Sequence, residues 1–541
     1  MVAGLLFLAS AAFVWWRNAQ VGVLVDIGYP LNTAMRIALG DVPYRDFPLA
    51  HSPGEFLIQA LLIKVFGSHY LVQIAYASLL GGAATVITYL IVRRLLEGLV
   101  RSPGTIAAIA VLPLIPLGIY AILPNPFYDP DACLAVLITI ALVLTARDRP
   151  SPRRLVVAGA VATLALFIKQ NIGGAFLVAL VGVLAVEASF RPERRRELPW
   201  LGLGIVGALA IEVALLQVVV GLDNFIHWTW TFALSGRGVA TDRIREFADP
   251  LMLWPAALIG AFALSVSRIP PRLRVPIFVG MTSLAVAPWL AVTATVLGPP
   301  ILFPPLLVLA AALGLTRAAR EGPTFELLLP LVVLATTLGT LQSQGLFGSS
   351  YGIFPLLSLA IACAARDLAA LVPQPRRLAS VGAAIVALIA TGSGAHYTLQ
   401  NSRLDFIDVN AKGPVASSTY PSLAGLSARG PYIHDLDQML FWVRDNVPAG
   451  DGLVLLPGED PVYFALERKP GLPSVYFYDI ATPYTPAEVS DIADRVGLRW
   501  VIVKDQLQMT TVPPLQPELV ARLTERATLV TTVGPYRVFR R

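Results

Sequence analysis

The chain has 541 residues, of which 56% are hydrophobic and only 14% are charged. Soluble domains carry about 25% charged residues, so this composition excludes a purely soluble protein and predicts a polytopic membrane protein. The formal net charge of +6 does not indicate nucleic-acid binding, because the arginines lie in short clusters between apolar runs. The two cysteines, Cys133 and Cys363, both fall in apolar segments far apart in sequence, so we expect neither a disulfide framework nor a cysteine-based metal site.

Apolar segments long enough to cross a bilayer, which takes roughly 20 residues each, follow one another up to about residue 396. Several are short, and the region 155–190 can be divided in more than one way. We therefore expect a transmembrane domain over residues 1–396 with about thirteen spans, at 3–22, 70–92, 104–123, 131–146, 155–168, 172–190, 199–221, 251–267, 275–296, 300–315, 324–341, 353–365 and 378–396.

Six arginine clusters separate these spans at matching parity, which under the positive-inside rule assigns them to cytoplasmic loops. The loops at 26–69, 124–130, 222–250 and 342–352 then face outward, as do residues 397–541. We expect a plasma-membrane protein with a cytoplasmic N-terminus, a retained first span and Arg17 reaching the outer interface. The clusters are Arg93, Arg94 and Arg101; Arg147, Arg149, Arg153 and Arg154; Arg191, Arg194, Arg195 and Arg196; Arg268, Arg272 and Arg274; Arg317 and Arg320; and Arg366, Arg376 and Arg377.

The first outer loop, residues 26–69, is polar and carries Asp26, Asp41 and Asp46. A carboxylate at the end of a membrane helix is costly to place there and usually has a function. Two apolar stretches of this loop, 31–39 and Gly54–Phe66, are too short to span a bilayer and are predicted to be interfacial helices. They would either pack the loop or wall a cavity at the membrane face.

Residues 397–541 have shorter apolar runs, and alternating strands and helices predict a small extracytoplasmic α/β domain. Thr485, Pro486 and Glu488 form a capping-box pattern with proline at the first helical position. The predicted strands are 453–456, 474–478, 500–503 and 528–533, and the predicted helices are 435–447, 460–468, 487–496 and 517–526.

One glycine pattern does not point to nucleotide binding. Gly202, Gly204 and Gly207 match GxGxxG, but they lie inside a predicted span. Such glycines allow close packing of membrane helices, and we interpret them in that way.

Two polar interruptions of the apolar sequence are candidate site segments. Tyr128-Asp129-Pro130-Asp131 opens a predicted helix, where Asp129 and Asp131 could cap it or contact a metal or an acceptor. Lys169-Gln170-Asn171 interrupts a 36-residue apolar stretch and could be an interfacial turn, or could place Lys169 against a lipid phosphate. His51 and His227 do not have zinc-ligand spacing, so no histidine-based metal site is predicted.

Several of these segments resemble the GT-C superfamily of polyprenyl-phosphate-sugar-dependent glycosyltransferases, nearest to the branch of protein O-mannosyltransferases and lipid A aminoarabinose transferases. Two departures are an isoleucine after Asp26, where much of the family has glutamate, and His51, where some relatives have lysine. The resembling segments are Asp26-Ile27-Gly28-Tyr29, the run 40–47, the proline turn His51-Ser52-Pro53-Gly54, Tyr128-Asp129-Pro130-Asp131 and Phe167-Ile168-Lys169-Gln170.

The resemblance implies transfer of a hexosyl or pentosyl group from a polyprenyl-phosphate donor to an extracytoplasmic glycan, lipid or protein. Asp26 would be the catalytic base, with Asp46 as the second candidate, in an inverting single displacement. Cationic groups would stabilise the phosphate. The candidates, in order, are Arg45, His51, Lys169 and Arg237. A divalent cation is an open expectation.

Two other classes remain as alternatives. A transporter or flippase of lipid-linked substrates would show internal repeats or broken helices at the membrane midplane. We find no such repeat, and the candidate charges cluster at the outer face. A non-catalytic membrane protein with an external sensor domain would not need a carboxylate-rich first loop.

Overall fold

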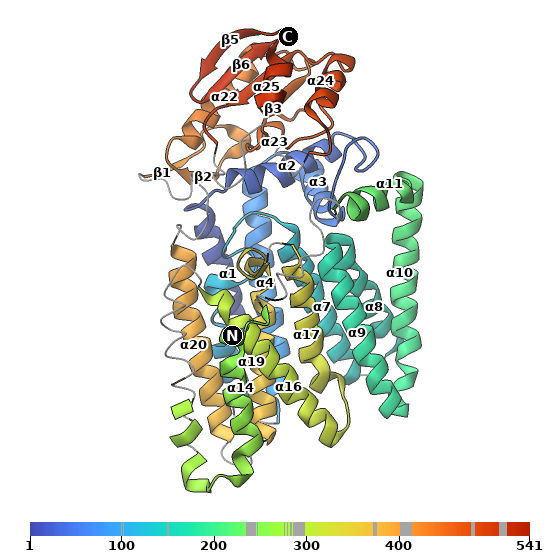
Figure 1. Cartoon of the computed structure of the whole chain (residues 1–541), viewed down its shortest axis with the longest axis vertical. Coiled ribbons are helices and arrows are strands. Elements are labelled where there is room, and N and C mark those ends of the chain that lie inside the picture. Colours follow the sequence, from blue (N-terminus) through green and yellow to red (C-terminus); the bar gives the residue numbers. More distant parts are fainter. Residues whose placement is uncertain are drawn as a thin grey trace.

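The computed structural model of the chain describes all residues except 99, 101, 149–150, 234–244, 246, 275, 279, 282–283, 285–297, 344, 372–375, 401–413, 478–481 and 508–516. A long helical body carries a small α/β domain, residues 414–541, at one end (Figure 1). We call this end of the body the domain face. The predicted class, a polytopic helical membrane protein with a small C-terminal α/β domain, is confirmed.

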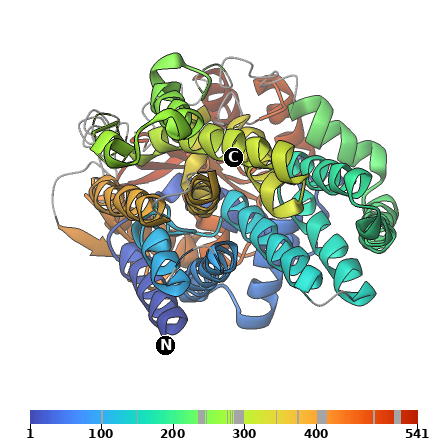
Figure 2. The same cartoon turned by 90° about the horizontal axis from the view of Figure 1, so that it is seen from below.

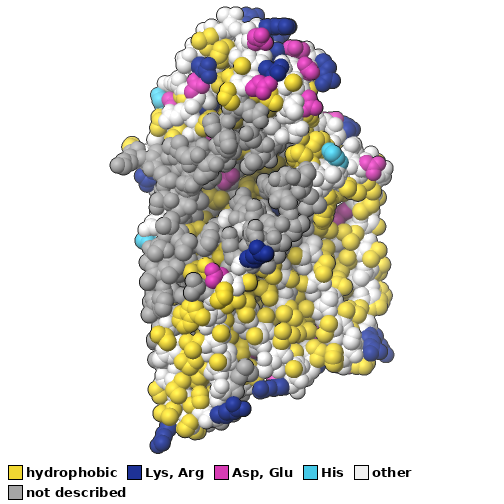
Figure 3. Space-filling model, viewed as in Figure 1, with side chains coloured by type: hydrophobic (Ala, Val, Ile, Leu, Met, Phe, Trp, Pro, Cys, Tyr) yellow, Lys and Arg dark blue, Asp and Glu magenta, His cyan; other side chains and the backbone are white. Residues whose placement is uncertain are grey.

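Among the described residues, seven helical stretches are long and apolar enough to cross a membrane: Tyr70–Leu96, Tyr128–Asp148, Gln170–Phe190, Pro192–Val219, Pro299–Glu321, Phe354–Leu371 and Val381–Leu399. Figure 3 shows hydrophobic side chains over the side of the body, with charged side chains mainly on the C-terminal domain and at the opposite end. The helices of the body are α1 (Val2–Asn18), α4 (Tyr70–Leu96), α5 (Pro103–Val111), α6 (Leu114–Leu117), α7 (Tyr128–Asp148), α8 (Pro152–Ile168), α9 (Gln170–Phe190), η1 (Pro192–Arg196), α10 (Leu198–Val219), α11 (Leu222–Ile226), η2 (His227–Phe232), α14 (Pro250–Ser265), η3 (Val266–Arg268), η4 (Pro299–Leu302), α16 (Phe303–Glu321), α17 (Phe325–Leu341), α18 (Gly345–Ser349), η5 (Ser350–Gly352), α19 (Phe354–Leu371) and α20 (Arg376–Leu399).

Each predicted span overlaps one long helix, with two exceptions. The segment 104–123 is divided into α5 and α6, because proline at 113 and 116 lacks the N–H that an uninterrupted helix requires. The segment 275–296 lies mostly outside the described residues. Arg17 was expected to reach the outer lipid interface. The structure buries it instead, with 2% of its surface exposed.

The arginine clusters meet at the end of the body opposite the domain face. Arg94 pairs with Asp148 at 2.8 Å, and Arg317 with Asp367 at 2.9 Å. Arg147 Nη1 donates to Glu187 Oε1 at 2.9 Å. These contacts join segments that are far apart in sequence. This agrees with the prediction that the loops with arginine clusters lie on one side of the membrane.

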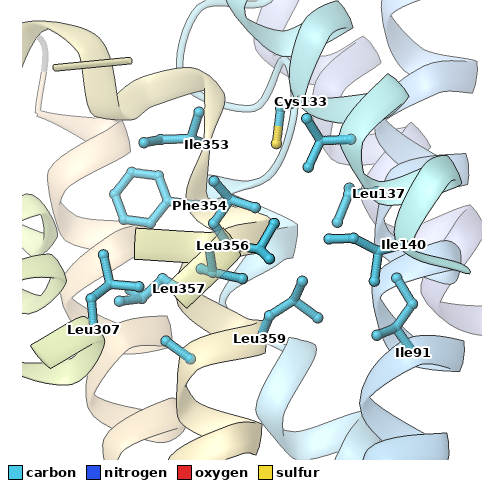
Figure 4. Packing of buried hydrophobic residues seen from close by; sticks show 14 of the residues in the cluster. Ile91, Cys133, Leu137, Ile140, Leu307, Ile353, Phe354, Leu356, Leu357 and Leu359 are labelled. Carbon is cyan, nitrogen blue, oxygen red and sulfur yellow. The ribbon is translucent and has the colours of Figure 1, made fainter. Parts of the chain in front are cut away.

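The core of the body is built around α19. Figure 4 shows Phe354 and Leu357 on the side of α19 towards Leu307 of α16, and Leu356 and Leu359 on the side towards Ile140 of α7 and Ile91 of α4. Seen from below, along the long axis, most helices appear end-on, and the N-terminus lies at the rim (Figure 2). Other helices surround α19, and 89% of its membrane-spanning residues are buried inside the protein.

Of the three glycines of the pattern in α10, Gly204 serves helix packing as predicted, whereas a Cβ on Gly202 or Gly207 would have no described atom within 4 Å. A Cβ on Gly204 would lie 2.1 Å from the carbonyl oxygen of Val156 in α8, and one on Gly159 would lie 2.2 Å from that of Leu201. Only glycine permits such close contact between the two backbones.

The first outer loop contains two helices at the domain face, α2 (Leu24–Ala38) and α3 (Gly54–Phe66), and α3 has its predicted bounds. α2 starts earlier than the predicted 31–39, so Asp26 lies in the first turn of α2 and not at the end of the first span. α2 and α3 lie across the top of the body in Figure 1.

The C-terminal domain contains a four-stranded sheet of order β3-β4-β6-β5. β3 and β4 are parallel, whereas β6 is antiparallel to both of its neighbours. The capping box of Thr485 and Glu488 is present at the start of α24, as predicted. The elements are β1 (Val415–Ser417), η7 (Pro421–Leu423), β2 (Ser427–Arg429), α22 (Tyr432–Asn446), β3 (Leu453–Leu456), α23 (Val462–Leu466), α24 (Pro486–Arg495), β4 (Trp500–Lys504), α25 (Pro517–Thr524), β5 (Thr528–Val533) and β6 (Tyr536–Arg540).

The predicted strand 474–478 is wrong over its described residues. Ser474 Oγ bonds the backbone of Tyr476, and the Phe477 N–H donates to Pro457 O at 2.9 Å, so the segment forms a folded loop. β6 takes the inner place in the sheet instead. β6 was not predicted because its arginines interrupt its apolar residues, of which Tyr536 and Val538 are buried.

Candidate active site

Asp26 has a carboxyl group that no described residue binds. Only its backbone carbonyl has a partner, Asn125 Nδ2 at 3.3 Å. Desolvation by the surrounding protein raises the pKa of Asp26 to about 7, although the side chain keeps partial contact with solvent. An unpaired carboxylate with a pKa near the operating pH is suited to accept a proton.

Lys169, a candidate from the sequence, is a buried cation. It occupies the junction between α8 and α9, with 3% of its surface exposed. Its Nζ lies 3.6 Å from Asp129 Oδ1 and 3.7 Å from the ring centre of Tyr128. The break in the helix therefore places a buried ammonium group between a carboxylate and an aromatic ring.

Two tyrosines interact electrostatically with Asp26. The hydroxyl of Tyr351, from η5, is within electrostatic reach of Asp26 and donates to Asp129 Oδ2 at 3.3 Å. Tyr476, from the C-terminal domain, is also within electrostatic reach of Asp26 and packs edge-on against Tyr29. Burial, followed in size by the carboxylates nearby, raises the pKa of both hydroxyls, so both remain protonated donors.

His51 joins the same cluster. Its ring stacks on Tyr128 with centroids 4.4 Å apart, and its Nδ1 lies 3.2 Å from the hydroxyl of Tyr29. Gln170 fixes the segment before the proline turn, because its Nε2 donates to Ala50 O at 3.1 Å and its Oε1 accepts the N–H of Ser52 at 3.1 Å. The predicted residues Asp26, His51, Asp129 and Lys169 are thus brought together.

Asp131 points elsewhere. Its two oxygens accept hydrogen bonds from the hydroxyls of Tyr76, at 2.6 Å, and Tyr120. This arrangement satisfies the buried carboxylate within the body.

Arg45 and Asp46 lie apart from the cluster. They pair with each other at 2.9 Å, and about half of the Arg45 side chain is exposed. The hydrogen bond from Arg45 lowers the pKa of Asp46, which weakens it as a base. Arg237 lies outside the described residues.

Within the described part of the chain, no group of three or more His, Cys, Asp or Glu side chains could hold a metal ion. A divalent cation remains a prediction. Tyr29, Tyr351 and Tyr476 were missed from the sequence, because tyrosines are common at membrane interfaces and no spacing distinguishes these three.

The fold and the site define a polytopic membrane protein with a desolvated carboxylate and a buried cation at the domain face. Residues 50–217 match the family model of dolichyl-phosphate-mannose-protein mannosyltransferase. The match confirms the resemblance to glycosyltransferases that use a polyprenyl-phosphate donor. His51, Asp129 and Lys169 fall inside the matched segment, and Asp26 precedes it. No curated protein matches the chain.

Among solved structures, the chain is similar to ArnT from Cupriavidus metallidurans bound to undecaprenyl phosphate, at 13% identity and a TM-score of 0.45, over 99% of this chain and 97% of that one. For the same protein in the apo state the values are 14%, 0.46, 99% and 97%. The Archaeoglobus fulgidus oligosaccharyltransferase, tethered with an acceptor peptide containing the NVT sequon, is 13% identical with a TM-score of 0.48, over 93% of this chain and 69% of that one.

Proposed function

We propose that this chain is an integral membrane glycosyltransferase that moves a sugar from a polyprenyl-phosphate donor to an extracytoplasmic glycan, lipid or protein. The observation that carries the proposal is the desolvated carboxyl group of Asp26, which no described residue binds. The buried pair of Lys169 and Asp129, with the Tyr351 hydroxyl bonded to Asp129, supplies a cation for the phosphate. The family match over residues 50–217 supports the donor class.

In the proposed reaction an acceptor hydroxyl attacks the anomeric carbon of the donor sugar. Its proton passes to Asp26 as the new C–O bond forms, and the bond from the anomeric carbon to the phosphate oxygen breaks. The polyprenyl phosphate leaves with the bonding electron pair, so the transfer needs no acid and inverts the anomeric centre. The ammonium of Lys169 stabilises the charge on the leaving phosphate, with His51 as a second contact.

The donor class is tested by giving the purified protein, in lipid, either a polyprenyl-phosphate sugar or the matching nucleotide sugar, each with candidate acceptors. We expect product only with the prenyl carrier, and none from the Asp26→Asn variant. Turnover of the nucleotide sugar in the absence of a prenyl carrier would contradict the proposal.

We further propose that the N-terminus is cytoplasmic and that the C-terminal domain faces outward. The arginine clusters at the end opposite the domain support this orientation. An alkaline phosphatase reporter, active only outside the cytoplasm, should be active when fused after Arg541 and inactive when fused near Arg196. Reversed activity at either point would show that the spans are miscounted.

A further inference from the structure

The helix that carries Asp26 packs against α3 of the first outer loop and against α23 of the C-terminal domain. Its apolar residues Leu24, Ile27 and Leu31 belong to the same buried cluster as Leu436 of α22 and Val462 of α23. Tyr128 and Ile168, which directly precede Asp129 and Lys169, belong to the main cluster of the body. Val25 and Tyr29, close to Asp26 on α2, pack in or against that cluster too. α2 therefore lies between the body and the C-terminal domain, and its position depends on both.

Asn32 makes the most specific contact between α2 and the C-terminal domain. Its side chain is fully buried. Its Nδ2 donates to Asp460 O at 2.9 Å, and its Oδ1 accepts the N–H groups of Tyr463 at 3.0 Å and Phe464 at 3.1 Å. One side chain thus binds three backbone groups around the start of α23. Asn32 lies six residues after Asp26, roughly 9 Å along the same helix.

The loop that Asn32 binds is itself fixed. Lys504 Nζ, also buried, lies 2.9 Å from Asp460 and 3.2 Å from Glu459, and the Tyr536 hydroxyl donates to Asp460 at 2.9 Å. The backbone of this loop touches α2 at Gly28, where a Cβ would lie 2.6 Å from Glu459 O. Because Gly28 is two residues from Asp26, a shift of the loop would displace the first turns of α2.

We propose that Asn32 is a positioning residue of the transfer reaction, through which the C-terminal domain holds Asp26 against the part of the site that the membrane helices provide. The C-terminal domain also supplies Tyr476, which packs edge-on against Tyr29 of α2. Removal of the Asn32 contacts should therefore displace the base and leave Lys169, at the junction of α8 and α9, in place. This inference rests on the proposed function.

Replacing Asn32 by alanine should lower kcat for transfer by about ten- to a hundredfold, the effect of a small misplacement of a reacting group. The KM for the polyprenyl-phosphate donor should change less than about twofold, because Lys169 lies at the junction of α8 and α9 and is paired with Asp129. Asn446→Ala is the matched control, since Asn446 is exposed and its amide bonds only Trp442 O of its own helix. The control should behave as the unmodified protein.

A second measurement follows the Asp26 carboxyl directly. Its infrared C=O band, assigned by its loss in Asp26→Asn, should titrate near pH 7 in the unmodified protein and at lower pH in Asn32→Ala, because a loosened helix lets water reach the carboxyl. The titratable groups that interact electrostatically with Asp26 are Tyr351 and Tyr476, and these two interact in turn with Asp129, Glu459 and Tyr29. None of these is changed by the substitution.

Gly28→Ala perturbs the same contact without removing the Asn32 bonds and should shift both readouts in the same direction. If either variant folds, as judged by cooperative thermal unfolding, with unchanged kcat and unchanged titration, the positioning role is wrong, even if the melting temperature falls. The titration needs neither donor nor acceptor. A shift in titration without any transfer by the unmodified protein would therefore contradict the proposed function and leave the positioning of Asp26 standing.

Discussion

Replacing Asp26 by asparagine is expected to lower the rate of sugar transfer by at least ~100-fold, because asparagine keeps the shape of the side chain and cannot accept the acceptor's proton. The carboxyl group makes no contact with a described residue that the amide would lose, so insertion and folding should survive. The measurement is product formation by purified protein in lipid at saturating donor.

The pH dependence gives an independent check. Because burial raises the pKa of Asp26 to about 7, the rate for the unmodified protein should increase about tenfold per pH unit below pH 7 and level off above it. The same raised pKa lowers the stability of the folded protein at pH values where the carboxyl is ionised in the unfolded chain. Asp26→Asn should therefore unfold at higher temperature than the unmodified protein at pH 8, with the difference shrinking as the pH falls towards 4.

Asp445→Asn, the same chemical change at an exposed carboxylate paired with Arg444, serves as the control and should leave transfer unaffected. Near-normal transfer by Asp26→Asn would contradict the assignment. A parallel Asp46→Asn variant would then show whether the second candidate is the base.

Replacing Lys169 by glutamine is expected to weaken use of the donor by roughly ten- to a hundredfold. A charge-assisted contact to a phosphate contributes about 1.5–3 kcal/mol, and each 1.4 kcal/mol corresponds to about tenfold in affinity. The effect should appear in the KM for the polyprenyl-phosphate sugar, measured at fixed acceptor.

The pair with Asp129 affects the design of this test. Removal of Lys169 takes away the ammonium group that lies 3.6 Å from the buried carboxylate of Asp129. Loss of one partner of a buried pair is destabilising by about 3–5 kcal/mol. The double variant Lys169→Gln with Asp129→Asn removes both charges of the pair. It should recover stability without recovering donor affinity.

Lys469→Gln removes a lysine that pairs with Asp41 at the edge of the C-terminal domain and should leave the donor KM unchanged. If the double variant regains donor affinity together with stability, Lys169 acts only as the partner of Asp129 and does not contact the phosphate.

Local chemistry was sufficient to predict several elements with their bounds. The length and apolarity of Gly54–Phe66 predicted a helix too short to span, and the capping box of Thr485 and Glu488 predicted the start of α24. The arginine clusters predicted which loops would meet at one end of the body. In each case the signal lies within a few neighbouring residues, or in a hydropathy pattern that the bilayer itself imposes.

The sequence by itself determined the class of protein, its membrane segments, the small α/β domain and the charged residues worth considering. Only the tertiary structure decided which of them form a site, because contacts such as Tyr351 to Asp129 and Asn32 to Asp460 join residues more than two hundred positions apart. It also paired Arg45 with Asp46 at the surface and desolvated the carboxyl of Asp26, which no described residue binds. Burial and pairing depend on what the rest of the chain packs against each residue, and local sequence does not encode that packing.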